Sequence, residues 1–162
     1  MIDDIDRKIL QILQEDARTS NADIARQVEM AASAVFERIR KLEERGIIQG
    51  YTARLHASAL GHGLLAFVFV RADEKPGARW TASRLAELPG VLEVHHIAGE
   101  DCFLVKVRAP DTESLGRLLR DSIGAVDTVQ STRTTIVLQT VKESSHLPLA
   151  PAPDAEMHLS DA

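Results

Sequence analysis

Residues 18–50 read RTSNADIARQVEMAASAVFERIRKLEERGIIQG, and this stretch decides the fold of the first third of the chain. Its apolar spacing predicts two short helices, over residues 20–28 and 32–45, joined by a tight turn. Gly46 ends the second helix, and the apolar residues within 47–55 indicate a wing and an extended connector. This is the outline of a winged helix-turn-helix, whose second helix is shaped to enter the major groove of duplex DNA.

The residues before this stretch predict one more helix. Asp4 can cap it, and Ser20 followed by Asp23 resembles a capping box for the helix after it. Apolar residues at helical spacing give the first helix one inward face. These residues are Ile5, Ile9, Ile12 and Leu13. The inward stripe of the helix over 32–45 consists of Val35, Ile39 and Leu42.

The length and composition indicate a globular protein of one ordinary or two small domains. The chain has 162 residues, of which 44% are apolar and 27% charged. No apolar run reaches the ~20 residues that span a bilayer, and the acidic start MIDDIDRK does not resemble a secretory signal. Cys102 is the only cysteine, which excludes an intrachain disulfide. We therefore expect a cytoplasmic protein without membrane association.

The charge argues against the simplest picture of a DNA-binding protein. The formal net charge is −5, and residues 1–54 hold nine Lys/Arg against ten Asp/Glu. DNA-binding domains often carry an obvious basic excess. The DNA hypothesis therefore depends on where charges lie on the surface, and an oligomer would pool several weak basic faces.

The second half of the chain follows a strand–helix–strand, strand–helix–strand order. The expected elements are strand 64–71, helix 78–88, strands 91–98 and 102–108, a helix from Asp111 or Thr112 to 123, and strand 132–141. This order predicts a ferredoxin-like βαββαβ domain, with an antiparallel sheet and its helices on one face. The fold class is therefore α+β, with an N-terminal winged helix-turn-helix before the ferredoxin-like domain.

The expected domain boundaries follow from these patterns. They are a DNA-binding domain over 1–52, a connector strand and hinge over 53–63, a ferredoxin-like domain over 64–143, and a tail over 144–162. Pro, Ala, Ser and Asp become frequent in the tail, so we expect its distal part to be disordered.

Six side chains of the predicted recognition helix point away from its apolar stripe or lie at the stripe's edge. These candidate DNA contacts are Ser33, Ala34, Glu37, Arg38, Arg40 and Lys41. The three cations can reach phosphates or base edges, and the two small residues lie near the end that enters a groove. The alternative is a solvated helix with ordinary ion pairs, for which the Glu37–Lys41 spacing is suitable. The complete helix-turn-helix frame favours DNA.

The chain from residue 2 to about 149 resembles the Lrp/AsnC family, the feast/famine transcriptional regulators of bacteria and archaea. The matching stretches are DDIDRKILQILQEDAR, RIRKLEERGIIQGYTA, PGVLEVHHIAGED, FLVKVRAPD and TTIVLQTVKESSHLPL. The resemblance implies a DNA-binding head joined to a ferredoxin-like sensing domain, the RAM domain. It also implies homodimers formed through the sheets, frequently assembling to octamers, with amino-acid effectors bound between dimers.

The chain departs from the family at the head of the recognition helix. The family usually has Ser there, preceded by Gly-Leu, whereas this chain reads Glu29, Met30 and Ala31. Loss of an N-cap hydroxyl typically costs ~1 kcal/mol of helix stability. Ser33 is the alternative cap for a helix that starts later.

A second departure lies in the effector loop. The family commonly carries Gly-x-x-Asp-Tyr, whereas this chain reads Gly99-Glu100-Asp101-Cys102-Phe103. A carboxylate suits the ammonium group of an amino acid. Adjacent strand residues point to opposite faces, so Asp101 does not simply replace a carboxylate at position 102 unless the turn re-aims it. We expect backbone groups of the loop to hold an effector, with Asp101 or Glu100 at the rim.

Hydroxyl groups at the start of the last strand can complete such a pocket. The predicted effector-binding residues are therefore Gly99, Glu100, Asp101, Cys102, Thr132 and Thr134, with Thr135 nearby. The alternatives remain open, because Gly-Glu-Asp is also an ordinary polar hairpin turn and threonines often simply fill a strand.

Other chemistry finds little support in the sequence. His95 and His96 are adjacent in a strand and face opposite ways, and no spaced Cys/His set accompanies them, so we expect no metal. No Walker or Rossmann glycine pattern and no Ser/His/Asp spacing occurs, so we expect neither a cofactor nor enzymatic activity. Cys102 lies beside two acids and is expected to be a buried thiol of low reactivity.

The favoured hypothesis is a sequence-specific DNA-binding transcriptional regulator that responds to an amino acid or a related small metabolite. An effector-independent architectural DNA-binding protein of the same fold is the first alternative, and the altered effector loop lends it support. An enzyme or allosteric subunit, with the head used only for oligomerisation, is the second. The missing catalytic constellation counts against it.

Overall fold

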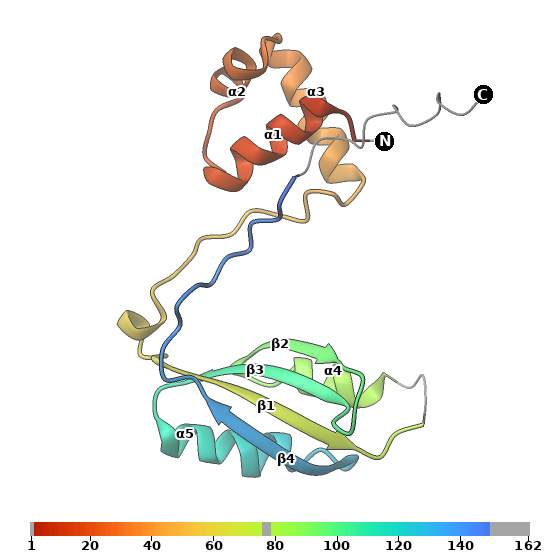
Figure 1. Ribbon diagram of the computed structural model, residues 1–162, viewed down its shortest axis with the longest axis vertical. Helices are drawn as coiled ribbons and strands as arrows, with labels where there is room; N and C mark the ends of the chain where they lie inside the picture. Colours follow the sequence, from red (N-terminus) through yellow and green to blue (C-terminus); the bar gives the residue numbers. More distant parts are fainter. Residues whose placement is uncertain (1, 76–78, 150–162) are drawn as a thin grey trace, which may run out of the picture. The chain divides into compact units, whose positions relative to one another are not determined.

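The computed structural model describes residues 2–75 and 79–149 (Figure 1). The chain forms two compact units. One comprises the described residues of Met1–Ala53 and Glu143–Ala162, and the other those of Arg54–Lys142. No helix within the described ranges has the length and apolarity needed to cross a membrane.

The first unit is built on α1 (Asp4–Glu15), α2 (Asn21–Val28) and α3 (Ala32–Glu44). The sequence predicts Asp4 as the N-cap of α1, but the N-cap is Asp3. Asp3 has extended backbone angles, and its carboxylate accepts a hydrogen bond of 2.8 Å from the backbone N–H of Asp6. Asp6 returns a contact of 3.4 Å to the Asp3 N–H, which completes a capping box one residue earlier than expected.

The turn between α2 and α3 lies where the sequence places it. Ser20 caps α2 by accepting from the backbone N–H of Asp23 at 3.1 Å. Glu29 ends α2 in the left-handed conformation, with φ 55°. The next helix begins at Ala32 after Ala31, whose side chain makes no capping hydrogen bond, so the alternative start capped by Ser33 is wrong.

The predicted apolar stripes meet in the core of this unit. The buried residues are Ile9, Ile24, Ala25, Val35 and Ile39, and the partly buried Ile5, Ile12 and Leu13 pack against them. Leu42, the last member of the α3 stripe, is also buried. The helical periodicity of the sequence therefore predicts the interior of the unit correctly.

Residues 47–55, predicted as wing and connector, contain no strand. Tyr51 and Leu55 are exposed, and an extended segment becomes a strand only when its backbone pairs with another segment. The Tyr51 hydroxyl donates to the Glu43 carboxylate of α3 at 3.0 Å and ties this segment to the helix. A short 3₁₀ helix, Ala57–Leu60, lies within the predicted hinge.

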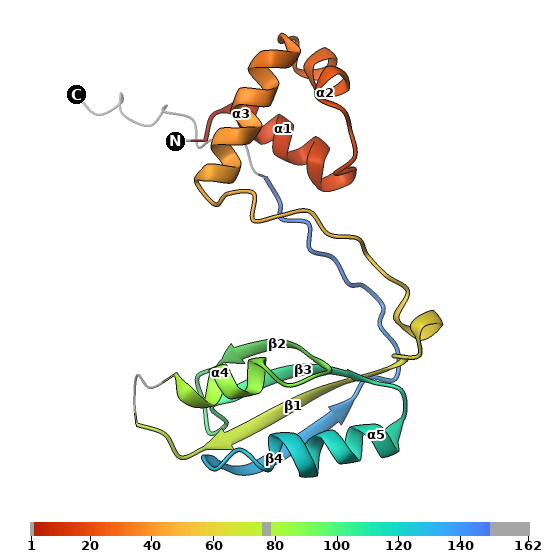
Figure 2. The same cartoon turned by 180° about the vertical axis from the view of Figure 1, so that it is seen from behind.

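The second unit has the predicted ferredoxin-like order. Its elements are β1 (Leu64–Ala72), α4 (Trp80–Ala86), β2 (Val91–His96), β3 (Phe103–Ala109), α5 (Thr112–Arg117) with a wider helical turn over Leu118–Ile123, and β4 (Val129–Ile136). The described strands form one antiparallel sheet in the order β2-β3-β1-β4. Figures 1 and 2 show α4 and α5 on the same side of this sheet.

Alternation along β1 and β3 assigns the two faces of the sheet. Val68 and Val70 of β1 lie opposite Val105 and Phe103 of β3, and all four are buried with Leu85 of α4. The intervening residues face the side without helices. They include the half-buried Phe67, Phe69 and Leu104.

Several element bounds differ from those expected. The last strand is predicted over 132–141 but spans Val129–Ile136, because β1 offers it partners only from Ala72 back to Ala66. Leu138 and Val141, beyond that partner, are 98% and 91% exposed. The predicted helix 78–88 is Trp80–Ala86, and its position 78 lies outside the described residues. The hairpin strands, predicted over 91–98 and 102–108, are Val91–His96 and Phe103–Ala109.

The beginning of the predicted tail contacts α1. The Gln14 side-chain amide donates to the Leu147 carbonyl at 3.2 Å and accepts from the Leu147 N–H at 2.7 Å. This two-point contact explains why the described residues after 143 belong to the first unit. The disorder expected for the distal tail concerns residues 150–162, which lie outside the described residues.

The contact between Tyr51 and Glu43 makes the phenol a reporter of the segment after α3. Burial, followed by the hydrogen bond to Glu43, raises the pKa of Tyr51 to about 12. The folded state thus keeps a proton that the unfolded chain loses near pH 10, and this contribution to stability is lost as the pH rises from about 10 to about 12. Because Tyr51 is the only tyrosine, phenolate absorbance reports it alone.

Replacement Glu43→Gln should lower the pKa of Tyr51 without returning it to 10, because burial remains the larger cause. Glu44→Gln is the matched control, since Glu44 pairs with Arg40 and should leave the titration unchanged. Equal titration curves for Glu43→Gln and the unmodified protein would contradict the contact.

Candidate DNA-binding and effector sites

The outward side of α3 carries most of the predicted DNA contacts. Ser33, Glu37, Arg40 and Lys41 are exposed, whereas Ala34 and Arg38 are half-buried. Burial of Val35, Ile39 and Leu42 on the other side fixes this orientation. The structure therefore presents a polar helical face that is not needed for the core.

Arg40 lies between two carboxylates on this face. Its guanidinium donates to Glu37 at 2.7 Å and to Glu44 at 2.9 Å. The ion-paired surface helix of the alternative reading is thus present, although the partner of Glu37 is Arg40 and not Lys41 as the spacing suggests. Exposed pairs of this kind contribute about 0–1 kcal/mol each, so a phosphate or base edge can replace the carboxylates at low cost.

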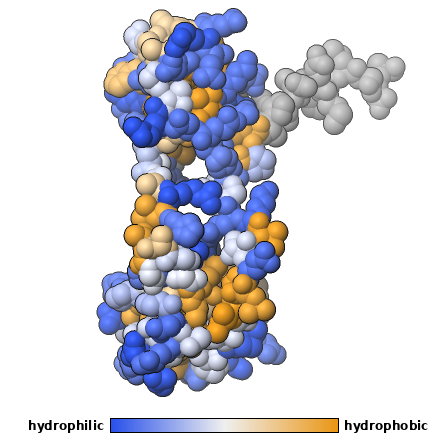
Figure 3. All heavy atoms as spheres, turned by 90° about the vertical axis from the view of Figure 1, so that its left-hand side faces the viewer, coloured by the Kyte–Doolittle hydropathy of each residue, from blue (hydrophilic) through white to orange (hydrophobic). Residues whose placement is uncertain are grey.

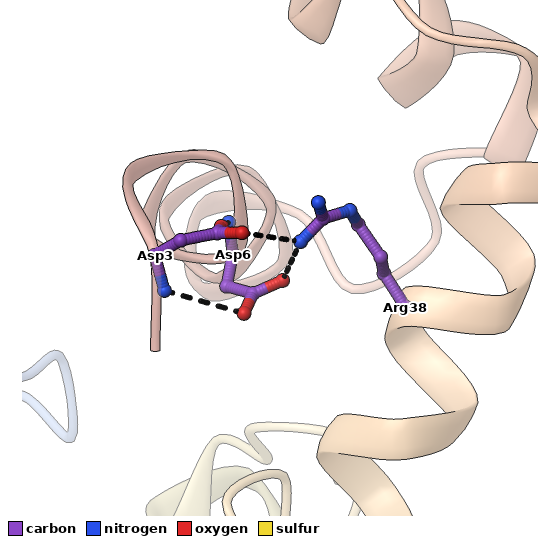
Figure 4. A network of polar contacts seen from close by, with 3 residues as sticks. All are labelled: Asp3, Asp6 and Arg38. Carbon is purple, nitrogen blue, oxygen red and sulfur yellow. Dashed lines mark hydrogen bonds and ion pairs between the residues drawn. The ribbon is translucent and has the colours of Figure 1, made fainter. Parts of the chain in front are cut away.

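Arg38 contacts carboxylates at the start of α1 (Figure 4). Its guanidinium nitrogen lies 2.8 Å from Asp3 and 2.7 Å from Asp6, and the Asp6 side chain is only 10% exposed. The side chain of Arg38, placed among the predicted phosphate contacts, is therefore already engaged in holding α3 against α1. A cleft of about 460 Å³ lies beside this network. Ala34 and Lys41 also line it, so they lie on the same side of the unit as the network.

These contacts stabilise the charged form of Asp3. The backbone N–H of Asp6, and then the Arg38 guanidinium, lower the pKa of the Asp3 carboxyl below its ordinary value. A carboxyl with a lowered pKa stabilises the fold above its ordinary titration range and loses that contribution as the pH falls through the lowered value. The network is thus complete at neutral pH.

The predicted effector loop joins β2 to β3. Gly99 has φ 139°, a backbone conformation that favours glycine, and Glu100 is exposed. The backbone N–H of Cys102 donates to the Val70 carbonyl at 2.9 Å, and its thiol donates to the Ala72 carbonyl at 3.4 Å. The thiol is half-buried, not buried as the sequence suggests. These bonds fix the end of the loop to β1.

Asp101 has a partner that the sequence does not reveal. Its carboxylate accepts from the Arg133 guanidinium at 3.0 Å, and that guanidinium also lies 3.9 Å from the centre of the Phe69 ring. The sequence signal that points to this contact is the alternation of side chains along the strands, which places Arg133 of β4 and Phe69 of β1 on the same side of the sheet. The two residues are direct neighbours in the register of these strands. The turn does re-aim Asp101, toward β4.

The predicted threonines lie at the same end of the sheet but face its other side. Thr132 lies opposite Val70 and Thr134 opposite Val68, both of which point to the helix-covered core. Thr135 lies opposite Phe67, on the side without helices. Within one chain the structure therefore joins Arg133 to the loop, while Thr132 and Thr134 neighbour it only through β1.

The two histidines belong to separate contacts. His95 lies 3.1 Å from Glu93, which also accepts from Lys106 at 3.1 Å, and His96 packs on the Phe103 ring. The histidine and then the lysine lower the pKa of the Glu93 carboxyl. Within residues 2–75 and 79–149, no three His, Cys, Asp or Glu side chains lie close enough to hold a metal ion.

Comparison with known proteins covers both units. Residues 2–49 match the model of a winged helix-turn-helix DNA-binding family, and residues 65–147 match the Lrp/AsnC ligand binding domain. The HTH-type transcriptional regulator FL11 of Pyrococcus horikoshii is 39% identical over 148 residues, which is 91% of this chain and 97% of that protein. The leucine-responsive regulatory protein of Rhizobium meliloti is 37% identical over 145 residues, 88% of this chain and 93% of that one.

Solved structures show the same arrangement of elements. A transcriptional regulator of Neisseria meningitidis in complex with L-Met has a TM-score of 0.85 at 30% identity, covering 92% of this chain and 97% of that one. AsnC of E. coli has a TM-score of 0.84 at 28% identity, covering 91% and 99%. The feast or famine regulatory protein of M. tuberculosis, complexed with L-methionine, has a TM-score of 0.84 at 33% identity, covering 93% and 100%.

The contacts of Arg38 predict a structural role that stability measurements can detect. Arg38→Ala leaves the buried Asp6 carboxylate without its guanidinium, and this should lower the free energy of unfolding by about 1–3 kcal/mol. Arg40→Ala, a matched control on the same helix, should lower it by less than Arg38→Ala does, because both of its ion pairs are exposed. Urea denaturation followed by far-ultraviolet circular dichroism measures both. Equal effects of the two replacements would show that the network contributes nothing specific.

Proposed function

Because this chain belongs to the Lrp/AsnC family of transcriptional regulators, we propose that it binds specific DNA sequences and responds to an amino acid or a related small metabolite. Like its relatives, it is a DNA-binding regulator and not an enzyme. The observation that carries the proposal of sequence-specific DNA binding is the polar face of α3, which the core leaves exposed on a three-helix base. We expect it to act in the cytoplasm.

In the proposed complex the N-terminal half of α3 enters the major groove. Ser33, Ala34 and Glu37 then face base edges, while Arg40 and Lys41 reach bases or phosphates. Arg38 acts chiefly as a positioning residue, because its contacts with Asp3 and Asp6 set the rotation of α3 on α1. Paired heads in a dimer would read half-sites one helical turn of ~34–36 Å apart, or a multiple of it.

We propose that subunits associate through the side of the sheet that carries no helices. Phe67, Phe69 and Leu104 lie there and are only half-buried, which leaves apolar surface for a second copy to cover. Figure 3 shows apolar residues reaching the surface of this unit. Homodimers of this kind, assembling to octamers, would present several heads, each with one weakly basic face, to one DNA segment.

The effector part of the proposal is supported by the related proteins solved with L-Met and by the loop that begins at Gly99. Gly99 and Glu100 are exposed, and Asp101 is held at the rim by Arg133. Backbone groups and one carboxylate suit the carboxylate and ammonium of an amino acid. Thr132 and Thr134 lie on the helix-covered side at this end of the sheet, and they are proposed to contribute hydroxyls where one dimer meets another.

Salt dependence tests the DNA contacts. Lys41→Ala should flatten the plot of log binding constant against log salt by about 0.9 for each Lys41 that contacts a phosphate. Lys75→Ala, in the other unit, is the matched control and should leave the slope unchanged. Arg38→Ala should leave the slope nearly unchanged if it only positions α3, whereas a flattened slope would assign it a phosphate as well. An unaltered slope for Lys41→Ala would remove Lys41 from the interface.

Calorimetry with the twenty amino acids tests the effector proposal. At least one should bind, and Asp101→Asn should weaken that binding about 10-fold or more, because a hydrogen bond to a charged group is worth about 1.5–3 kcal/mol. Asp121→Asn, on the opposite side of the unit's core, should have no effect. If no amino acid binds while DNA binding persists, the protein is an effector-independent architectural member of the family.

A further inference from the structure

Phe36 is an exposed aromatic residue on the recognition helix. Among the residues of α1, α2 and α3, all of which the structure describes, it is the only large apolar side chain that is exposed, at 53%. The other three phenylalanines, Phe67, Phe69 and Phe103, lie in the sheet of the second unit, where each is buried or half-buried. The core of the first unit therefore does not explain Phe36.

Its position in the helix places it among the proposed DNA contacts. Ser33, Phe36, Glu37 and Arg40 are spaced i, i+3, i+4 and i+7, which puts them on one face of α3. Ser33, Glu37 and Arg40 are polar and exposed. Phe36 thus interrupts a polar surface with one apolar patch, close to the end of α3 that is proposed to enter the groove.

The major groove offers one apolar group at a base edge. Thymine carries a 5-methyl group there, and apolar side chains, including that of Phe, contact it in direct readout. The polar neighbours of Phe36 read other groups, since a carboxylate accepts from cytosine and a guanidinium donates to guanine. A thymine methyl is therefore the chemical complement of Phe36 on duplex DNA.

We propose that Phe36 is a specificity-determining residue whose ring contacts the 5-methyl group of a thymine in each half-site. This inference rests on the proposed binding of α3 in the major groove and adds the identity of one base that it reads. The ring gains affinity by removing the methyl group from water. Burial of one such carbon is worth about fourfold in affinity per half-site.

Thymine-to-uracil replacement tests the contact, because uracil pairs identically and lacks only the methyl group. The full-length protein is first used to select its preferred duplex from a random library. Each thymine of that duplex is then replaced by uracil in turn, and binding is measured by fluorescence anisotropy. At one position per half-site, the replacement should weaken the binding of the unmodified protein about fourfold. The Phe36→Ala variant should bind the thymine and uracil duplexes equally.

Matched variants separate this contact from other roles of the side chain. Phe36→Leu, which keeps an apolar group, should retain part of the preference for thymine, and Phe36→Gln should lose it. Lys41→Ala should weaken binding to both duplexes while keeping their ratio. Circular dichroism and sedimentation should show that all four variants keep the fold and the assembly of the unmodified protein.

The outcomes distinguish the inference from the function on which it rests. If selection yields no preferred duplex, the proposed sequence-specific binding fails. If a preferred duplex is found but no uracil position weakens binding, or Phe36→Ala keeps the same thymine-to-uracil ratio, only the role of Phe36 is overturned. A loss of subunit assembly in Phe36→Ala would likewise overturn it and assign the ring to a contact between copies of the chain.

Discussion

The single apolar stripe of α3 decides which of its side chains can reach a partner. Val35, Ile39 and Leu42 are buried, and because a helix has 3.6 residues per turn, the side opposite this stripe must face the solvent. The Arg38 contacts with the start of α1 fix the same rotation through charges. Hydrophobic burial and ion pairing thus favour the same orientation of α3. The proposed DNA contacts are the side chains that neither the core nor this ion-pair network uses.

The charge of the chain favours the proposed binding of DNA by several subunits at once. The chain has a net charge of −5, and the guanidinium of Arg38 is occupied with two nearby carboxylates. Arg40 is likewise paired with two glutamates, which a phosphate must first displace, so the net attraction of one head for DNA is small. Since two linked heads bind far more tightly than one, DNA affinity depends on how many heads an assembly presents. Under the proposed function, a small effector would alter DNA binding by altering the assembly, without touching α3.

The sequence predicts the features that burial imposes and misses those that depend on distant partners. Helical and alternating periodicity identify the buried stripes, the βαββαβ order and the outward residues of α3. Each of these features depends only on the pattern of residues that are close together in the sequence. The end of β4 depends on where β1 stops, and the partners of Arg38 and Asp101 lie 32 or more residues away. One residue of error at the cap of α1 arises because Asp3 and Asp4 are chemically equivalent and only the backbone distinguishes them.

The proposed effector loop is bonded to β1 at one end, through Cys102, and carries at its rim an aspartate held by an exposed arginine. Cys102 is bonded to β1 through both its backbone and its thiol, so the position that the family gives to a carboxylate is here part of the frame. The carboxylate has moved to Asp101, whose Arg133 partner is 63% exposed and can be exchanged at low cost. A bound amino acid would therefore replace one ion pair with another. In the proposed function, its effect on DNA binding would be limited to the difference between its affinities for the assemblies that it meets, so the regulation would depend on contacts across subunits.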